Sequence, residues 1–358
     1  MVSLMVLCLA AVADGGMADS GVADAGASDG GAVVVGPYDA GIPATWRLDA
    51  KLKGSLRESL ITDFTKKEGG IGESALTREE AEALLDDPRA ALIYGDKTVS
   101  IVAPSMTVRH RQEHVDMMKL FLAPERVEAG TKFMKDKDEV LSATEKRTGV
   151  DRQVIIGILM WESKLGTITG NWFAFNALAS QAFFVEEANA IALARDEEKA
   201  MLSGADAVKR DPKDKKKKLT DEELAKIAEA KAAAEKKQAG RVETIRSRGR
   251  KNLVALVRQC KSRGIDPLGV KGSWAGALGF PQFMPASLRW AEDGNGDGKI
   301  DLFDMDDAIA SVGRYLASAG FKKSARDAVY DYNHEEAYVA GVLAFAEALK
   351  APKDAGVP

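Results

Sequence analysis

A loop of oxygen-bearing side chains at residues 293–304 most limits what this chain can fold into. Acidic or amide residues stand at loop positions 1, 3, 5, 9 and 12, and Gly298 stands at position 6, where the chain must turn sharply. This is the spacing of an EF-hand loop, in which calcium takes six to eight oxygen ligands and position 7 contributes its carbonyl. The pattern predicts a structural calcium site formed by Asp293, Asn295, Asp297, Lys299, Asp301 and Asp304.

Position 12 of the loop weakens the metal prediction. Asp304 stands where EF-hand loops have glutamate, and its shorter side chain offers fewer oxygens and separates calcium less well from magnesium. A turn rich in glycine and aspartate that binds no metal remains the alternative.

The segment before this loop, residues 272–287, is rich in glycine but lacks the spacing and the final lysine of a phosphate-binding loop. Small residues allow the backbone to approach a ligand closely, and Ser273, Gln282 and Ser287 add side-chain donors and acceptors. Such a lining suits a ligand rich in hydroxyl groups. A structural interpretation stays open for Gln282 and Ser287, which also suit caps and turns.

A helix is predicted between Asp151, as its cap, and Gly166, as its end, because apolar residues recur there at helical spacing: Val154, Ile155, Ile158, Leu159 and Leu165. Glu162 lies on the same apolar face. Burial disfavours the charged form of a carboxyl and raises its pKa, which makes a glutamate a general acid near neutral pH. Periodicity leaves a second interpretation open, in which Glu162 reaches solvent at the helix end or pairs with Lys164.

Taken in chain order, these pieces resemble the lytic murein transglycosylase B family. The motifs are ESKLG at 162–166, GSWAGALGFPQFMPAS at 272–287, the loop at 293–304, residues 311–316, Tyr332-Asn333-His334 and Tyr338-Val339. The similarity extends to residues 126–130 and 149–150, and it covers about residues 115 to 185 and 245 to 348.

The resemblance implies a mainly α (α+β) protein with a lysozyme-like core that acts on peptidoglycan. It implies that Glu162 works first as acid and then as base, so that the β-1,4 bond between MurNAc and GlcNAc breaks without water and leaves a 1,6-anhydro-MurNAc end. Such a reaction needs one carboxyl, whereas ordinary glycosidases need two. The implied cleft residues are Ser273, Gln282, Ser287, Tyr332, Asn333 and Tyr338, the tyrosines being open to a core role as well. No organic cofactor is implied.

Two other functions stay open: a catalytically silent, calcium-stabilised peptidoglycan-binding protein that uses the same cleft, and a hydrolytic muramidase. The chain also departs from the family, because no adjacent arginine pair follows the catalytic helix. The candidates to meet a peptide stem or a sugar carboxylate instead are Arg241, Arg246, Arg248 and Arg250.

The beginning of the chain indicates export. Residues 2–13 are apolar and end in an Ala-Val-Ala cleavage pattern, which predicts a signal peptide at 1–13 and a periplasmic protein. A lipid anchor at Cys8, with outer-membrane association, is the rival interpretation. Cleavage would leave Cys260 as the one cysteine, without an intramolecular disulfide. No later apolar run is long enough to span a membrane, and the net charge of -4 gives no sign of nucleic-acid binding.

Composition divides the rest of the chain. Residues 14–45 are mostly glycine, alanine and aspartate, which predicts a disordered linker; a helical region is expected at 46–125, the lysozyme-like core at 126–349 and a flexible tail at 350–358. In the helical region, Thr77 and Glu80 have the spacing of a capping box.

A charged insertion at about 187–240 interrupts the predicted core. Thr220 and Glu223 form a second capping box, which opens an Ala/Glu/Lys helix expected to stop at Gly240. The lysines at 215–218 precede it, so the insertion is a candidate docking element for a protein partner or an anionic polymer.

His110, Glu113 and His114 match the H-x-x-E-H pattern of zinc proteases. Chance explains this match better, since histidines four apart on a charged helix usually face solvent.

Overall fold

The computed structural model describes residues 44–67, 73–92, 95–209 and 218–350. The predicted signal peptide, the predicted linker up to residue 43, the lysines at 215–217 and the tail from residue 351 lie outside these residues.

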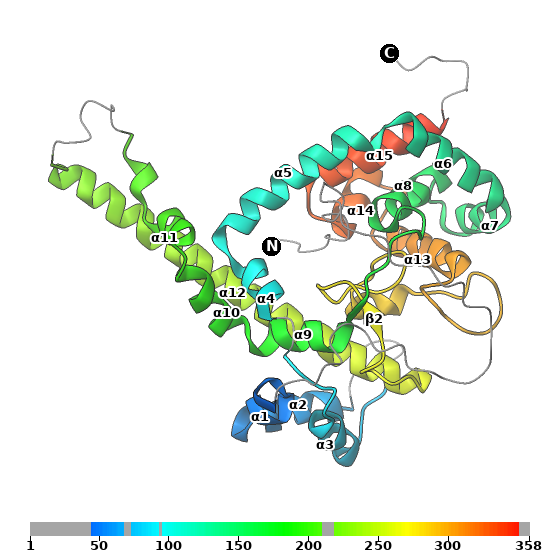
Figure 1. The fold of residues 1–358 in the computed structure, drawn as a ribbon. Coiled ribbons are helices and arrows are strands. Elements are labelled where there is room, and N and C mark those ends of the chain that lie inside the picture. Colours follow the sequence, from blue (N-terminus) through cyan, green and yellow to red (C-terminus); the bar gives the residue numbers. More distant parts are fainter. Residues whose placement is uncertain (1–43, 68–72, 93–94, 210–217, 351–358) are drawn as a thin grey trace, which may run out of the picture.

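Helices dominate the described residues, which confirms the mainly α part of the predicted fold class (Figure 1). The elements are η1 (Ala44–Trp46), α1 (Leu48–Lys51), α2 (Gly54–Thr65), α3 (Arg78–Asp86), α4 (Gly95–Val102), α5 (Pro104–Phe121), α6 (Pro124–Asp136), α7 (Asp138–Thr148), α8 (Arg152–Ser163), β1 (Trp172–Phe173), α9 (Ala174–Phe183), α10 (Val185–Leu193), α11 (Asp196–Leu202), η2 (Ala205–Ala207), α12 (Asp221–Arg263), β2 (Lys271–Gly272), η4 (Pro285–Trp290), α13 (Met305–Ser318), α14 (Ala325–Tyr332) and α15 (Glu336–Lys350).

Helix α8 lies at the centre of the core, and its residues from Val154 to Ser163 are all buried. The Trp161 ring is 1% exposed and packs against Phe121 of α5, with ring centroids 4.7 Å apart, and against Tyr338 of α15 at 5.1 Å. A helix that is apolar all round is stable only when neighbours cover every face. Helices α5, α6, α7, α13 and α15 supply that cover.

Two glycines set how closely α8 and α15 approach each other. A Cβ atom at Gly341 would lie 2.5 Å from the Trp161 ring, and one at Gly157 would lie 3.0 Å from the Val342 carbonyl oxygen. A side chain at Gly341 would push the two helices apart, because real Cβ contacts are not as short as 2.5 Å, and one at Gly157 would make a contact tighter than most. The close approach holds Tyr338 of α15 beside the last turn of α8.

The end of α8 differs from the prediction. The helix stops at Ser163, three residues before Gly166, and Lys164 and Leu165 take left-handed φ values of 47° and 56°. The Leu165 amide donates to the Leu159 carbonyl at 3.0 Å, which satisfies one of the free carbonyls at the helix end. Asp151 makes no side-chain cap; its carboxylate accepts instead from Lys350 at 3.0 Å.

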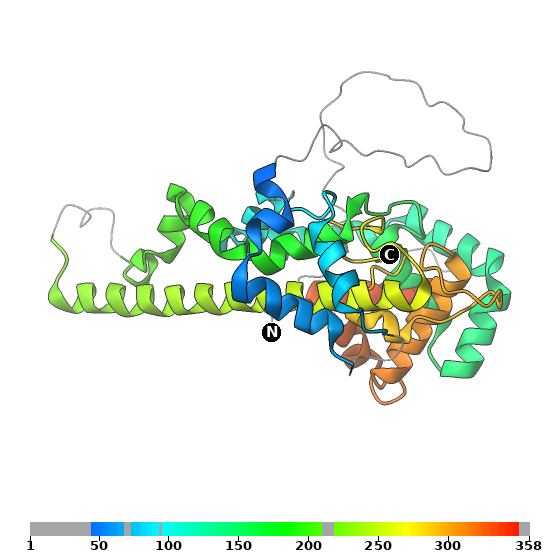
Figure 2. The same ribbon diagram turned by 90° about the horizontal axis from the view of Figure 1, so that it is seen from below.

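Helix α12 is the longest element and projects beyond the body of the molecule (Figure 2). The expected stop at Gly240 is wrong, because α12 continues to Arg263. A single glycine costs a helix only about 1 kcal/mol, and good helix formers flank Gly240 on both sides. Past Gly240, the helix packs closely on α9, where a Cβ at Gly249 would lie 2.8 Å from the Cβ of Gln181.

Both predicted capping boxes are confirmed. The side chain of Thr77 accepts from the Glu80 amide at the start of α3, and that of Thr220 accepts from the Glu223 amide at the start of α12. In each box the glutamate carboxylate accepts from the threonine amide in return.

The short sheet brings the glycine-rich segment to the end of α8. Strand β1 pairs with β2 in antiparallel fashion, with Trp172 opposite Gly272. Within the described part of the chain, no helix is both long and apolar enough to cross a bilayer.

Candidate functional site

Glu162 occupies the last turn of α8 and is 3% exposed. This burial excludes the alternative in which Glu162 reaches solvent at the helix end. Burial raises the pKa of its carboxyl to about 8, since an ion loses its water there, while the Tyr338 hydroxyl partly opposes the rise. The Glu162 Oε1 atom has no hydrogen-bond partner among the described residues. The carboxyl is therefore protonated at neutral pH and has an oxygen left over for a ligand.

Three tyrosines gather beside this carboxyl. Tyr338 is 0% exposed and Tyr332 is 2% exposed, and a charge on Glu162 raises the pKa of both hydroxyls further above their usual range, where burial has already placed it. Both hydroxyls keep their protons at any working pH. The ring of Tyr315 stacks edge-on against that of Tyr332, with centroids 4.9 Å apart.

Hydrogen bonds fix two of these tyrosines. The Tyr332 hydroxyl donates to the Pro281 carbonyl at 2.5 Å, and the Tyr315 hydroxyl donates to the Asp331 carbonyl at 3.0 Å. The Tyr338 hydroxyl is buried and outside regular hydrogen-bond geometry with the described groups. Of the three, Tyr338 is thus the one whose hydroxyl is not tied to a backbone carbonyl and acts on the Glu162 carboxyl.

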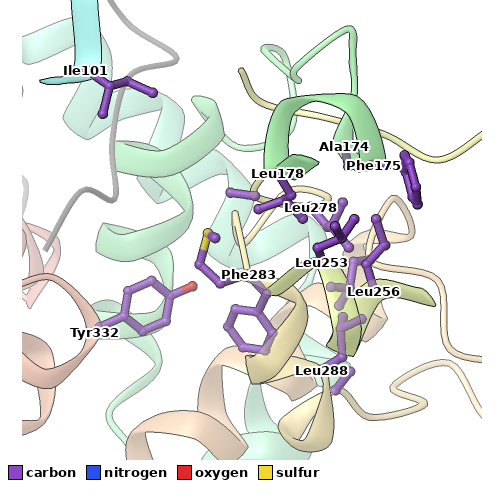
Figure 3. Close-up of a cluster of buried hydrophobic side chains, with 14 of the residues drawn as sticks. Ile101, Ala174, Phe175, Leu178, Leu253, Leu256, Leu278, Phe283, Leu288 and Tyr332 are labelled. Atoms are coloured by element: carbon purple, nitrogen blue, oxygen red, sulfur yellow. The ribbon is translucent and has the colours of Figure 1, made fainter. Parts of the chain in front are cut away.

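The glycine-rich segment folds into a tight turn that contacts the tyrosines through Pro281 and Phe283, and Gln282 lies between these two residues in the chain. Gln282 has a φ of 51°, is 5% exposed, and donates from Nε2 to the Gly279 carbonyl at 2.7 Å. The next residue, Phe283, lies between Tyr332 on one side and Leu256 and Leu288 on the other (Figure 3). A left-handed φ in a residue with a side chain is uncommon and marks a backbone held by its surroundings.

The remaining predicted cleft residues have structural partners. The Ser273 hydroxyl accepts from the Ala277 amide at 3.0 Å, inside the same turn. Asn333 is 0% exposed and ends α14, where its amide donates to the Val329 carbonyl. Ser287 is half-buried in η4, which packs on α12. The structure thus brings Tyr332 and Tyr338 to Glu162. Gln282 and Asn333 are buried next to residues of this cluster, whereas Ser273 and Ser287 have local partners in their own turns.

The sequence patterns predict no site role for Tyr315, which lies in the segment 311–316, or for Trp161, which precedes Glu162 on the apolar helix. Trp161 packs on His114 of α5 at 5.9 Å, so α5 covers the residue beside the acid. An aromatic residue next to Glu162 could have indicated a site role for Trp161. The helical periodicity explains Trp161 equally well as a core residue.

The expectation that the histidines of the H-x-x-E-H pattern on α5 face solvent is wrong for His114, which packs on Trp161 in the core. This imidazole is 6% exposed, and burial lowers its pKa to about 4. No group of three or more histidine, cysteine or acidic residues comes together among the residues with a described placement. These observations give the zinc interpretation no support.

The loop at 293–304 folds through hydrogen bonds from its own amides to its side chains. Asp293 accepts from the Gly296 and Gly298 amides at 2.6 and 2.8 Å, Asn295 accepts from Asp297, and Asp297 accepts from Lys299. Gly298 has a φ of 82°, the turn for which glycine is needed at position 6. Asp301 accepts from the Phe303 amide at 2.8 Å.

The last residue of the loop forms the N-terminal cap of α13. Asp304 caps that helix by accepting from the amides of Asp306 and Asp307. Asp307, which is 1% exposed, accepts from the amides of Gly294 and Asp301 at 2.7 Å and so closes the loop on the helix. In chemistry, the set of aspartate, asparagine and carbonyl oxygens fits a hard cation.

The loop also contacts the frame of the site. The Phe280 amide donates to the Leu302 carbonyl at 2.8 Å, and a Cβ at Gly279 would lie 2.3 Å from the Leu302 Cβ. Phe303 stacks edge-on against Phe280 with ring centroids 6.1 Å apart. The position of the loop therefore sets the position of the turn that carries Gln282.

The four candidate arginines lie in different surroundings. Arg246 pairs with Glu186 and Glu243, and Arg250 pairs with Asp63 at 2.7 Å. Arg241 and Arg248 lie on another face of α12, where both line one cavity.

A family model described as Transglycosylase SLT domain matches residues 73–219 and 232–329. Membrane-bound lytic murein transglycosylase B of Escherichia coli (strain K12) is 27% identical over 213 residues, which is 59% of this chain and 43% of the relative. The chain thus spans less than half the length of that curated relative.

Solved structures show the same fold. The Escherichia coli lytic transglycosylase SLT35 in complex with bulgecin A superposes with a TM-score of 0.54 at 18% identity, over 82% of this chain and 92% of that chain. A structure of SLT35 in complex with calcium gives 0.52 at the same identity and the same shares. The soluble lytic transglycosylase SltB1 from Pseudomonas aeruginosa gives 0.53 at 18% identity, over 82% of this chain and 97% of that chain.

Proposed function

Because the chain belongs to the Transglycosylase SLT domain family, we propose that it is a lytic transglycosylase that cleaves the β-1,4 bond between MurNAc and GlcNAc in peptidoglycan. The observation that carries the proposal is the buried Glu162, whose carboxyl has a pKa of about 8 and a free oxygen. A carboxyl that holds its proton at neutral pH is a competent general acid.

The proposed reaction uses this one carboxyl twice. Glu162 gives its proton to the glycosidic oxygen as the bond to the anomeric carbon of MurNAc breaks. The carboxylate then takes the proton of the C6 hydroxyl of the same sugar while that oxygen bonds to the anomeric carbon. The products are a free 4-hydroxyl on GlcNAc and a 1,6-anhydro-MurNAc end, and Glu162 is protonated again. The attacking group belongs to the substrate, so its effective concentration is high and no second carboxyl is needed.

The surroundings of Glu162 suit both proton transfers of the proposed reaction. The apolar and aromatic packing favours the neutral acid before the reaction, and the nearby Tyr338 hydroxyl, which keeps its proton, stabilises the carboxylate formed midway. Gln282, Tyr332 and Asn333 lie in the frame that we propose lines the glycan site, with Ser273 and Ser287 beside them.

We further propose that the loop at 293–304 holds a structural calcium ion through oxygens of Asp293, Asn295, Asp297, Lys299, Asp301 and Asp304. The ion would fix the loop and, through Leu302 and Phe303, the turn that bears Gln282. A calcium complex of one structural relative supports the choice of metal. We also propose export to the periplasm, on the apolar segment at residues 2–13.

The test is the mass of the products released from purified murein sacculi. Anhydro-muropeptides, which are one water lighter than the corresponding hydrolysis products, are expected from the wild type and not from Glu162→Gln. Products carrying the extra water would make the protein a muramidase. Intact sacculi that retain bound protein would make it a binding protein and would refute the enzymatic proposal.

A further inference from the structure

A cavity of about 650 Å³ opens between α5, α11 and α12. Its lining includes no acidic residue and four basic ones, Arg111 on α5 and Lys237, Arg241 and Arg248 on α12. Two other lining residues, Val108 and Met201, are 62% and 41% exposed, so apolar surface borders the basic groups. A concave site that joins apolar walls to charges of one sign suits a ligand that is partly apolar and carries the opposite charge.

Arg248 is the lining residue that most needs a counter-ion. Its Nε and Nη2 atoms are buried and have no hydrogen-bond partner among the described residues. Burial and the nearby charge of Arg241 lower the pKa of Arg248 to about 10. A buried guanidinium without a counter-ion destabilises a fold. A carboxylate in the cavity would remove that penalty.

The nearest acid does not supply this carboxylate. Glu198 is the acidic residue whose charge acts on Arg241, but its two oxygens accept from the amide and the hydroxyl of Ser105 at 2.8 and 2.5 Å. Arg241 is itself held by the Ile101 carbonyl, to which its Nη2 donates at 2.6 Å. The cavity therefore keeps its positive charge, and its two arginines stand two helical turns apart on α12.

The described chain begins close to this cavity. Trp46 of η1 packs on Phe184, with ring centroids 6.0 Å apart, and α10 begins at the next residue. Further along α10, the side-chain oxygen of Asn189 accepts from Nε2 of Gln238, a lining residue of the cavity, at 2.8 Å. Since an α-helix rises about 1.5 Å per residue, Trp46 lies on the order of 20 to 30 Å from the cavity.

The residues that precede Ala44 have the composition that complements the cavity. Residues 33–35 are three valines, and the chain has no lysine or arginine before Arg47. The eleven residues from 33 to 43 can span up to about 36 Å, so the valines can reach the rim of the cavity and Asp29 its arginines. Residues 14–43 contain five aspartates: Asp14, Asp19, Asp24, Asp29 and Asp39.

We propose that the cavity is a docking site for the chain's own acidic N-terminal segment: the Asp29 carboxylate binds the Arg248 guanidinium, and the valines at 33–35 cover Val108 and Met201. A segment that its composition predicts to be disordered can still bind where charge and apolar groups match. Attachment to the same chain raises its effective concentration at the cavity. The contact joins the start of the chain to the insertion and goes beyond the proposed function, on which it does not depend.

The test is a double-mutant cycle between the segment and the cavity, measured by urea unfolding of the full chain as exported. Asp29→Asn should lower the equilibrium constant for folding about 10-fold in the wild type, because a charge-assisted hydrogen bond is lost. In the Arg248→Gln background the same change should have no effect, since the partner is already absent. A residue that merely stabilises α12 would show no such coupling to Asp29.

Arg246→Gln is the matched background, since Arg246 lies on the same helix but pairs with Glu186 and Glu243. In that background Asp29→Asn should still lower the folding constant about 10-fold. A second variant replaces all five aspartates of residues 14–43 with asparagine, so that no neighbour can take the place of Asp29. Coupling of Arg248 to the five-fold variant alone would overturn the assignment to Asp29, and coupling to neither variant would overturn the docking itself.

Inorganic phosphate tests the rival occupant, a small free anion. If the segment fills the cavity, phosphate at constant ionic strength should raise the Tm of the five-fold variant more than that of the wild type, because the wild-type site is already occupied. A rise that is equal in the two proteins and is lost in Arg248→Gln would show that a free anion enters the wild-type cavity, and the proposal would fail.

Discussion

Replacing Glu162 with glutamine should disable the protein and stabilise it at the same time. Glutamine keeps the size of the side chain but has no transferable proton, so turnover should fall by roughly 10²-fold to 10⁴-fold or more. The stability gain follows from the pKa of about 8 in the folded protein against 4.5 for a free glutamate. The buried site favours an uncharged side chain, and glutamine is uncharged at every pH.

The sign and size of the gain depend on pH. Below pH 4.5 the carboxyl is protonated in both the folded and the unfolded chain, and its contribution to folding is fully present. Between pH 4.5 and about 8 the unfolded chain ionises first, so the wild-type free energy of unfolding falls by up to about 1.4 kcal/mol per pH unit. The accumulated loss is roughly 3 kcal/mol at pH 7, and it stops growing above pH 8, where the folded carboxyl ionises too.

Urea unfolding of both proteins at pH 5, 6, 7 and 8 measures this effect directly. The difference in the free energy of unfolding, variant minus wild type, should increase with pH and level off near pH 8. Glu139→Gln, which replaces an exposed carboxyl on α7, is the control and should show a small difference at most. A Glu162→Gln difference that does not change with pH would show that the carboxyl is ionised in the folded protein, and the assignment of Glu162 as the acid would fail.

Three further outcomes are expected. Tyr338→Phe removes the hydroxyl that lowers the pKa of Glu162, so the alkaline limb of the pH–rate profile should move to higher pH; a shift to lower pH would contradict this arrangement. Calcium added to chelated protein should raise the Tm by binding only the folded state, and Asp297→Ala should abolish the rise; a Tm that ignores calcium in metal-free protein rejects the site. Gln238→Ala should cost about 1 to 3 kcal/mol of stability in urea unfolding because it leaves buried groups unpaired, whereas the exposed Lys236→Ala should cost little; equal effects would show that the insertion does not pack as described.

Sequence periodicity could place Glu162 on an apolar face, but it could not decide whether that face was covered. Helix α15 covers that face: its Gly341 leaves room for the Trp161 ring, and its Tyr338 covers Glu162. These contacts join residues far apart in the chain, and no local pattern encodes them. The same holds for Ser273, whose hydroxyl is used inside its own turn once the fold closes.

Local patterns were reliable where the physics is local. The capping boxes at Thr77 and Thr220 formed because threonine and glutamate satisfy each other's amides within one turn. The prediction that the helix stops at Gly240 was wrong because glycine destabilises a helix only slightly. The packing of the following residues of α12 on α9 offsets that cost.

The insertion and the acid are connected through one element, α5. At its start, the buried Glu198 of α11 accepts from the Ser105 amide, where a negative charge is stabilised by the helix dipole as well as by hydrogen bonds. Further along, His114 packs on Trp161, the residue before Glu162. The insertion, whose composition alone suggests a separate arm, therefore anchors the helix that packs on Trp161, the residue before the proposed acid. Loss of Glu198 should loosen the start of α5 and, through His114, the packing on Trp161 beside Glu162, so changes in the insertion should alter turnover.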